Sequence, residues 1–405
     1  IRTRCFMDTL VKSTSNVSPA EMLDKAIAMQ AKLREKAQHT RSLRRIPDET
    51  MTELIDAGFF KMMQPARYGG YEMNPKHFYD VVFEIARACP STGWVLSVVG
   101  VHNWQLGLLD DRAQQDVWGQ DDNQLISSSY APKGKAEPVE GGFKFSGQWQ
   151  FSSGCDHCNW IFVGGLLPAD PNMPEMPQLG SFLIPRSDYE IIDDWHTTGL
   201  QGSGSKTLVV KDAFVPDYRV HSFMQGFLCQ GPGQVLNTSP LYKLPFGQVF
   251  IRAVSTPSIG TAQGALDAYC DYNSKRLNSV GQKVVESPAG QIAGARALSA
   301  IRTAKLKLHH AFDTLLEYAE KGEPYRDIDR AEFRYDSCNT VETLIPVVQE
   351  LLANSGGTAI YQGNTVNELY QDILAFRQHA ANQPYAPTTN LGSVMFGAPS
   401  KDFFS

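Results

Sequence analysis

The residues best suited to chemistry lie where a predicted strand ends in two hydroxyls and a glycine. Residues 145–151 alternate aromatic or small side chains with Ser and Gln, as a half-buried strand does, and the run stops at Ser152, Ser153 and Gly154. Hydroxyls at such a turn can hydrogen-bond the edge of a bound planar group, and Gly154 lets the backbone come close. The alternative is a surface hairpin that happens to carry serines, and the segment alone does not choose between them.

Two of the nine histidines, His102 and His379, lie in apolar patterns typical of helices. Histidine has an unperturbed pKa of about 6.5, so it can accept or donate a proton at neutral pH. A single histidine on an apolar helix face is, however, more often a core residue with satisfied hydrogen bonds. Neighbouring motifs have to decide between these readings.

A loop rich in glycine and serine, residues 199–206, precedes another predicted strand. Its backbone N–H groups, the hydroxyls of Ser203 and Ser205, and the amine of Lys206 suit a phosphate. A dinucleotide fingerprint follows a strand and opens a helix, which this loop does not do, so a Rossmann domain is excluded. As a lone motif, a plain turn is the more common explanation.

The elements that must position these residues change type twice along the chain. The periodicity predicts helices at about 22–38, 47–58, 75–88 and 91–109, short strands at 143–151, 160–166, 181–185 and 207–215, and helices at 248–278, 288–321, 329–354 and 365–382. Residues 226–245 are predicted to be a linker. This order indicates an α+β protein with a helical domain at 1–123, a small β-barrel or sandwich at 124–225 and a helical domain at 226–405.

Composition excludes several classes of protein. The chain has 405 residues, of which 42% are hydrophobic and 20% charged, as in soluble globular proteins. A net charge of −6 gives no reason to expect nucleic acid or an anionic membrane as partner. The apolar run at 94–101 is shorter than the ~20 residues of a membrane span. No secretory signal is evident, and Met7 is a candidate natural start.

The cysteines predict neither a disulfide framework nor a metal site. There are seven, without regular spacing, and Cys155 and Cys158 form a C-x-x-C pair that has no second pair to complete a metal site. We expect these thiols to be structural and the protein to be cytoplasmic. A redox- or metal-responsive protein that uses Cys155 and Cys158 is the alternative from another class.

Blocks of sequence in order across roughly residues 20 to 397 resemble a known family. The family is the flavin-dependent aromatic monooxygenases of the acyl-CoA dehydrogenase fold, which are the oxygenase components of two-component systems. Members that hydroxylate the phenolic ring of a 9,10-seco-steroid are most similar, and the 4-hydroxyphenylacetate 3-hydroxylase oxygenase is more distant. The blocks are residues 43–48, 64–70, 97–104, 127–132, 152–157, 181–187, 199–205 and 379–382.

The resemblance implies a fold and a reaction. The fold has an N-terminal helical domain, a central β-barrel and a C-terminal four-helix bundle, assembled as a homotetramer. Reduced FMN or FAD, supplied by a separate NAD(P)H:flavin reductase, would react with O2 to give the C4a-hydroperoxide. That species would hydroxylate a phenol to a catechol, and a bulky phenol such as the seco-steroid is expected.

The resemblance also implies roles for individual residues. Ser153 would face flavin N5, and the end of its strand, with Trp149, Phe151 and Ser152, would line the cofactor. His102, His379 and Ser128 would meet the substrate phenol, although Ser127 or Ser129 could replace Ser128. The loop residues Ser203, Ser205 and Lys206 would bind the flavin phosphate. Arg276 would reach the flavin phosphates of a neighbouring subunit, unless it only forms a solvated helix end with Lys275.

The sequence departs from the family at residues 371–374, where an acid, Asp372, is kept but an Arg and a His are replaced. Two alternatives within the fold remain. An acyl-CoA dehydrogenase needs a carboxylate base beside the flavin, and residues 378–383 contain none. The second alternative is a monooxygenase that acts on nitrogen or sulfur. Only the resemblance, which implies that His102 meets a phenol, argues against it.

Overall fold

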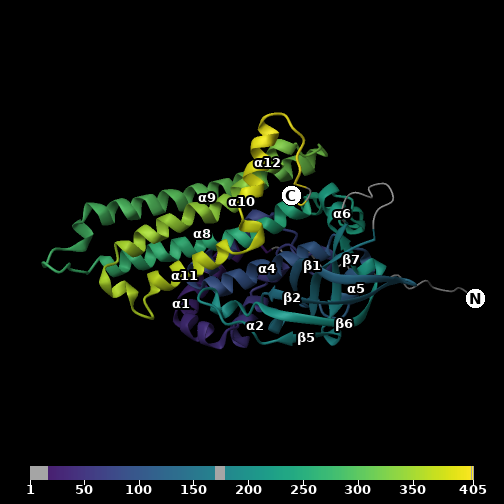
Figure 1. The fold of residues 1–405 in the computed structure, drawn as a ribbon, viewed down its shortest axis with the longest axis horizontal. Helices are drawn as coiled ribbons and strands as arrows, with labels where there is room; N and C mark the ends of the chain where they lie inside the picture. Colours follow the sequence, from purple (N-terminus) through teal and green to yellow (C-terminus); the bar gives the residue numbers. More distant parts are fainter. Residues whose placement is uncertain (1–16, 169–177, 403, 405) are drawn as a thin grey trace, which may run out of the picture.

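The computed structural model describes residues 17–168, 178–402 and 404. Helices come first, strands follow, and helices complete the chain (Figure 1). The N-terminal helices are α1 (Pro19–Leu43), α2 (Asp48–Asp56), α3 (Pro75–Ala88), α4 (Pro90–Leu106) and α5 (Asp111–Trp118). The strands are β1 (Ile126–Val139), β2 (Gly142–Ser152), β3 (Trp160–Leu166), β4 (Leu179–Pro185), β5 (Tyr189–Ile192), β6 (Lys206–Pro216) and β7 (Val220–Ser222). The later helices are α6 (Phe223–Leu228), α7 (Pro232–Leu236), α8 (Phe246–Asn273), α9 (Pro288–Lys321), α10 (Asp327–Ala353), α11 (Thr365–Arg377) and α12 (Tyr385–Met395).

The strands form one open sheet in the order β5-β6-β2-β1-β3-β4-β7. Neighbours are antiparallel except β1 and β3, which run parallel. Within the described part of the chain, β5 and β7 are the two edges of this sheet and do not pair with each other. The predicted closed barrel is therefore not confirmed.

The predicted alternation of buried and exposed side chains along β2 fails at the C-terminal end of the strand. Trp149 is fully buried, whereas Phe151 is 66% exposed and has a φ of 70°. The register between β2 and β6 shifts between Trp149 and Ser152, so an extra residue bulges out of the ladder. Phe151 therefore points to solvent rather than along the face that carries Trp149.

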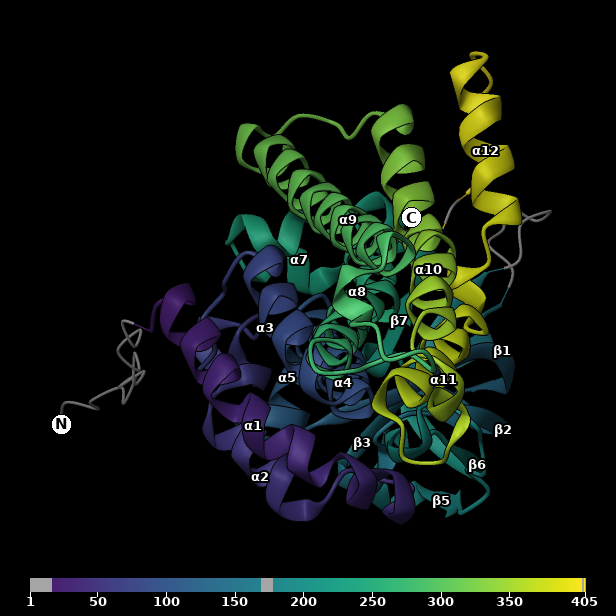
Figure 2. The same ribbon diagram turned by 90° about the vertical axis from the view of Figure 1, so that its left-hand side faces the viewer.

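Helix α4 lies at the centre of the molecule. It contacts α3, α8 and β1, and so lies between the sheet and the long C-terminal helices (Figures 1 and 2). All of its residues are buried, as expected for a helix that is apolar on every side. Side chains of α4 can therefore meet both the end of β2 and the helices that follow.

Most predicted helices are confirmed, and three expectations need correction. The 226–245 segment is not a plain linker, because α6 ends and α7 lies within it. Strand β1 was not predicted, since its Ser, Pro and Lys content is unusual for a strand. The last predicted helix ends at Arg377, because His379 caps a separate turn by accepting a hydrogen bond from the N–H of Ala381. Met7 lies outside the described residues.

Helices α8, α9, α10 and α11 pack side by side along the C-terminal part of the chain (Figure 1). Helix α12 packs against α10 and projects beyond the other helices in Figure 2. No helix among the described residues has the length and apolar character needed to cross a membrane.

Candidate active site

The candidate site lies along one face of α4, to which the helix contributes four side chains. Trp94, Val98, His102 and Gln105 are spaced by four, four and three residues, which places them on one face of the helix. His102 follows Trp94 by eight residues, a rise of about 12 Å. Two polar clusters lie along this face, one at Trp94 and one at His102.

The first cluster, here called the Ser153 cluster, consists of Trp94, Ser153, Ser203, Ser205 and His379. The indole N–H of Trp94 donates to Ser153 Oγ at 2.8 Å. Ser153 Oγ lies 2.7 Å from Ser205 Oγ, which lies 2.7 Å from Ser203 Oγ. The His379 ring packs edge-on against Trp94, with ring centres 5.7 Å apart. The structure thus brings together four of the residues that the sequence singled out.

Gly154 holds the turn of this cluster against α4. Its φ is +69°, and a Cβ at this position would lie 2.8 Å from Val95 Cγ1. Its N–H donates to the carbonyl oxygen of Ser203 at 2.9 Å. Gly154 therefore brings the backbone of this turn close to helix α4.

The second cluster, here called the His102 cluster, consists of His102, Gln105, Tyr130, Ser181 and His221. The Tyr130 hydroxyl donates to Gln105 Oε1 and lies 3.2 Å from His102 Nδ1. His102 Nδ1 is 3.2 Å from Gln105 Oε1. The Gln105 amide nitrogen donates to Ser181 Oγ at 3.2 Å and to His221 Nδ1 at 3.1 Å. Four elements, α4, β1, β4 and β7, supply these side chains.

Each histidine of this cluster has one ring nitrogen that makes no hydrogen bond within the described residues. His102 Nε2 and His221 Nε2 are buried, and neither has a hydrogen-bond partner among the described residues. A buried polar atom without a partner is costly, so such atoms often mark a ligand site.

The three consecutive serines of β1 are separated by their hydrogen bonds. Ser127 accepts a bond from Ser152 Oγ at 3.0 Å, and Ser129 donates to the carbonyl oxygen of Gln150 at 2.7 Å. Ser128 lies on the same face of β1 as Tyr130, and its hydroxyl opposes the rise that burial causes in the pKa of Tyr130. Ser128 is therefore the serine that faces the His102 cluster.

Aromatic rings surround His102. Tyr130, Phe162 and Phe250 lie with ring centres 5.9, 6.0 and 6.2 Å from the imidazole. Next to them, Phe223 and Phe404 pack against Phe250 or its neighbours and also line a cavity of about 800 Å³. Other lining residues of this cavity include Leu179, Met224, Arg334 and Pro387.

Burial keeps the histidines of both clusters neutral. It lowers the pKa of His102 to about 3, against a smaller opposing contribution from Gln105, and lowers the pKa of His221 to about 3. Burial, together with the charge of Arg334, lowers the pKa of His379 to about 4. At neutral pH each ring therefore carries one proton, on one of its two nitrogens.

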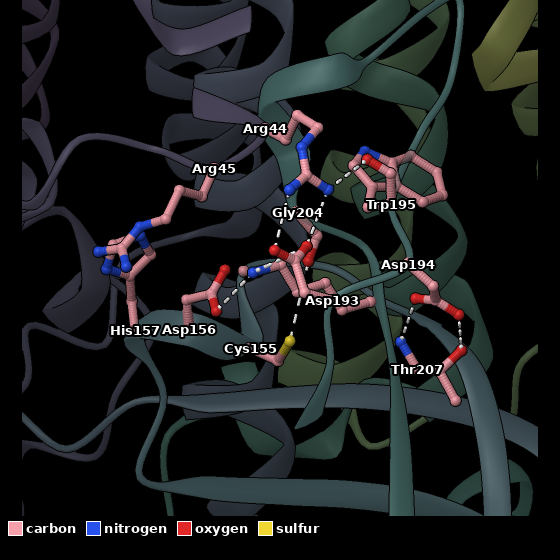
Figure 3. Close-up of polar contacts among 12 residues, drawn as sticks. Arg44, Arg45, Cys155, Asp156, His157, Asp193, Asp194, Trp195, Gly204 and Thr207 are labelled. Carbon is pink, nitrogen blue, oxygen red and sulfur yellow. Dashed lines mark hydrogen bonds and ion pairs between the residues drawn. The ribbon is translucent and has the colours of Figure 1, made fainter. Parts of the chain in front are cut away.

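Lys206 forms ion pairs within the chain, and its predicted role in binding the flavin phosphate stays a prediction. Its amine is buried and lies 3.0 Å from Asp156 and 3.5 Å from Asp193. Asp193 in turn accepts two hydrogen bonds from Arg44 (Figure 3). The positive charge of Lys206 is thus balanced by two carboxylates, which leaves it no excess charge to attract a phosphate.

The stretch that departs from the family pattern has a structural role. The Asp372 side chain is fully buried and forms a bidentate ion pair with Arg41 of α1. It also accepts a hydrogen bond of 2.7 Å from the N–H of Leu200. Asp372 therefore fastens the 199–206 loop to α1 and α11.

Trp149 and Phe151 do not lie in the Ser153 cluster, and their predicted contact with the cofactor stays a prediction. Trp149 stacks on Phe145 within the core of the sheet, and its N–H donates to two carbonyl oxygens. Phe151 lies at the surface, 6.4 Å from the Trp195 ring. Ser152 is buried and bonded to Ser127 behind the turn, so Ser153 is the hydroxyl of this pair that faces α4.

Arg276 lies far from both clusters within one chain. Its guanidinium donates to the carbonyl oxygen of Asn354 at 2.9 Å and to Asn273 at 2.8 Å. Helix α8 contacts α4 at Ala253, whose carbonyl oxygen accepts a hydrogen bond from Ser97 Oγ. Arg276 comes 23 residues after Ala253, which corresponds to about 35 Å if the helical rise held throughout.

Sequence reasoning missed Trp94, Gln105, Tyr130 and His221. The helical spacing of Trp94 and Gln105 to His102 was a usable signal, since all three face the same side. His221 lies on a three-residue strand far along the chain, and no spacing in the sequence links it to α4.

The fold defined by these elements is that of the acyl-CoA dehydrogenases. Models of the acyl-CoA dehydrogenase N-terminal and C-terminal domains match residues 21–118 and 253–384. The solved structure of 3-HSA hydroxylase from Rhodococcus sp. RHA1 matches with a TM-score of 0.90 and 40% identity, over 95% of this chain and 99% of that one.

Curated relatives narrow this class. The oxygenase subunit HsaA, a flavin-dependent monooxygenase of Rhodococcus jostii (strain RHA1), is 42% identical over 374 residues, 91% of this chain and 97% of that protein. The oxygenase component of p-hydroxyphenylacetate 3-hydroxylase from Acinetobacter baumannii is 30% identical, over 95% of this chain and 91% of its own. The chain therefore belongs to the family of flavin-dependent monooxygenase oxygenase subunits.

Proposed function

We propose that this protein is the oxygenase component of a two-component system that hydroxylates a phenol next to its hydroxyl group, giving a catechol. The observation that carries the proposal is His102 Nε2, a buried nitrogen without a partner in the described structure, in a wall of aromatic rings. A phenol placed there can stack on these rings and donate a hydrogen bond from its hydroxyl to the imidazole.

The residues around His102 suit the electronic demand of the reaction. Electrophilic attack on the ring is fastest once the phenol has phenolate character. A neutral His102 can accept or share the proton, and the Ser128 hydroxyl can stabilise the oxygen that remains. Residues 378–383 contain no carboxylate to serve as a base beside the flavin, which disfavours the acyl-CoA dehydrogenase alternative. Relatives such as the resorcinol hydroxylase of Rhizobium sp. (strain MTP-10005), 30% identical, also favour a phenol over a nitrogen or sulfur substrate.

The Ser153 cluster fits the edge of a flavin ring. Trp94 already donates to Ser153, and the serine hydroxyls can rotate to donate or accept. His379 Nδ1 accepts the N–H of Ala381, so its Nε2 carries the proton and can donate. Reduced FMN or FAD held against this cluster would supply the oxygen atom that O2 provides for the ring. The buried cluster excludes water, which protects that oxygen from loss as H2O2.

We also propose the assembly and setting of the enzyme. Because Arg276 lies far along α8 from both clusters, it would serve the cofactor of a neighbouring subunit, as in a homotetramer. Ser203 and Ser205 are kept as cofactor residues through their contact with Ser153. The three units at 1–123, 124–225 and 226–405, a barrel-like middle domain and a C-terminal four-helix bundle follow the family pattern. A separate reductase supplies reduced flavin, and buried thiols suit the cytoplasm.

A turnover screen tests the proposal. Phenols of increasing size, up to a seco-steroid phenol, are incubated with chemically reduced FMN or FAD and O2, and catechol and H2O2 are both measured. We expect catechol from at least one bulky phenol, with less H2O2 than in the absence of substrate. Equal H2O2 with and without every phenol, and no catechol, would refute the proposal.

A further inference from the structure

The hydrogen bonds of Gln105 link the two buried histidines of the His102 cluster. Gln105 is completely buried, one turn after His102 on α4. Its carbonyl oxygen faces His102 Nδ1 and the Tyr130 hydroxyl, while its amide nitrogen faces His221 Nδ1 and Ser181. A single amide thus lies between two imidazole rings.

A primary amide has one end that only accepts hydrogen bonds and one end that only donates them. The oxygen of Gln105 accepts from the Tyr130 hydroxyl and lies 3.2 Å from His102 Nδ1, a contact that is favourable only when Nδ1 carries a proton. The nitrogen of Gln105 requires a lone pair on His221 Nδ1. Because each neutral ring carries one proton, the remaining nitrogens are fixed as well: His102 Nε2 is unprotonated, and His221 Nε2 carries the proton.

We propose that Gln105 is a positioning residue that fixes His102 in the tautomer with a free Nε2 lone pair, and that His221 and Ser181 hold the Gln105 amide in this orientation. The consequence for catalysis rests on the proposed function, because only the Nε2 lone pair can accept the proton of a phenol. In the opposite tautomer, His102 would present an N–H donor to the phenol oxygen and could not remove its proton.

Contacts of its ring hold the His221 side chain in place beside Gln105. Its Nε2 lies against the backbone of Gly226, where a Cβ would come within 3.0 Å, and the ring meets Phe246 edge-on at 4.9 Å. Either tautomer of His221 leaves Nε2 without a polar partner in the described structure, so only its Nδ1 contact with Gln105 distinguishes them. Ser181 adds a second acceptor for the same amide nitrogen.

The tautomer can be measured without turnover. We suggest solid-state nitrogen NMR of the purified enzyme with ring-labelled histidine at neutral pH, with the His102 signals identified by their loss in His102→Phe. We expect a protonated Nδ1 and an unprotonated Nε2 for His102. A His102 ring protonated at Nε2 in the wild-type enzyme would overturn the proposal, whether or not the enzyme hydroxylates phenols.

Two substitutions at Gln105 separate positioning from packing. Gln105→Met keeps the size but removes both polar ends, so His102 should change to the Nε2-protonated form and catechol formed per O2 consumed should fall about tenfold. Gln105→Glu keeps an oxygen acceptor toward His102 in either protonation state. It should preserve the tautomer and lose less than about threefold in coupling.

A purely structural role for Gln105 predicts the reverse order, because a buried carboxylate harms packing more than a methionine does. Gln114→Met is the matched control, since Gln114 is equally buried but bonds to Leu109 and Arg67 outside the site. It should leave the His102 signals unchanged. Retention of the wild-type tautomer and coupling in Gln105→Met would refute the proposal, and this holds even if Gln105→Glu does not fold.

Discussion

The His102 cluster and the loop at residues 199–206 are both buried and polar, but they satisfy their polar groups in opposite ways. Around the loop, Lys206 pairs with Asp156 and Asp193, and Asp372 pairs with Arg41. Around His102 every side chain is uncharged, and two ring nitrogens have no partner within the described residues. Paired buried charges indicate a structural joint, whereas neutral ring nitrogens that are buried without a partner indicate a place for a ligand.

From the sequence, Lys206 was predicted to bind the flavin phosphate rather than to pair with carboxylates of the chain. A lysine in a glycine- and serine-rich loop looks like a phosphate ligand until the partners of its charge are known. The difference between the two regions can be tested by asking whether a substitution changes coupling or stability.

The largest effect is expected at His102. His102→Ala removes the proton acceptor, so we expect catechol formation to fall at least about 100-fold while O2 is still consumed and released as H2O2. The measurement is catechol and H2O2 per flavin oxidised. His309→Ala serves as control, because His309 pairs with Asp80 outside both clusters. Unchanged catechol yield in His102→Ala would remove His102 from the site.

Lys206→Met should affect stability rather than chemistry. It leaves Asp156 buried without its cation, which costs about 3 kcal/mol in the free energy of unfolding. The affinity for flavin should stay within about twofold of wild type, measured by fluorescence quenching of oxidised flavin. A loss of affinity of tenfold or more, with normal stability, would restore Lys206 as a phosphate ligand.

Ser153→Ala should act at the other end of α4. It removes the acceptor of the Trp94 N–H and the hydroxyl nearest the expected flavin edge. We expect H2O2 release from the reduced enzyme in O2 to quicken about tenfold, followed by stopped-flow absorbance. Ser152→Ala is the matched neighbour and should have little effect on this rate, because its hydroxyl faces Ser127. Equal traces for both variants and wild type would exclude this role.

Acid should destabilise the protein through its neutral histidines. The pKa of His221 is about 3 in the folded state and about 6.5 in the unfolded state, so unfolding takes up a proton between these values. The stability that its neutral form contributes is complete above pH 6.5 and is lost as the pH falls toward 3. Each such histidine adds a slope of up to about 1.4 kcal/mol per pH unit.

His221→Asn tests this contribution, because asparagine can still accept the Gln105 bond but does not titrate. Urea unfolding at several pH values between 6 and 4.5, at fixed protein concentration, should give a shallower slope for the variant. Parallel lines for variant and wild type would show that His221 takes up no proton on unfolding.

The smallest effect is expected at Cys158. Its buried thiol donates to the carbonyl oxygen of Gly154, and burial raises its pKa well above the usual range. Cys158→Ser should therefore cost less than about 1 kcal/mol and leave coupling unchanged. Loss of activity together with bound metal in the wild type would favour the redox- or metal-responsive alternative.

Local patterns predicted those parts of the site that depend on nearby residues. The turn at Ser153 and the buried helix carrying His102 follow from hydrophobic periodicity and from serine and glycine at a strand end. The opposite directions of Trp149 and Phe151 were not predicted, because a bulge between Trp149 and Ser152 turns one ring inward and the other outward. A one-residue shift in the register between two strands cannot be recognised from the alternation of polar and apolar residues in the sequence.

The sequence by itself determined the order of helices and strands, the apolar character of α4 and the residues with suitable chemistry, because these depend on contacts between near neighbours. Only the tertiary structure decided that Ser128 faces the His102 cluster, that Lys206 is neutralised, and that Gln105 joins His102 to His221. These properties depend on which polar atoms meet after distant segments pack, and hydrogen-bond partners are chosen at that stage.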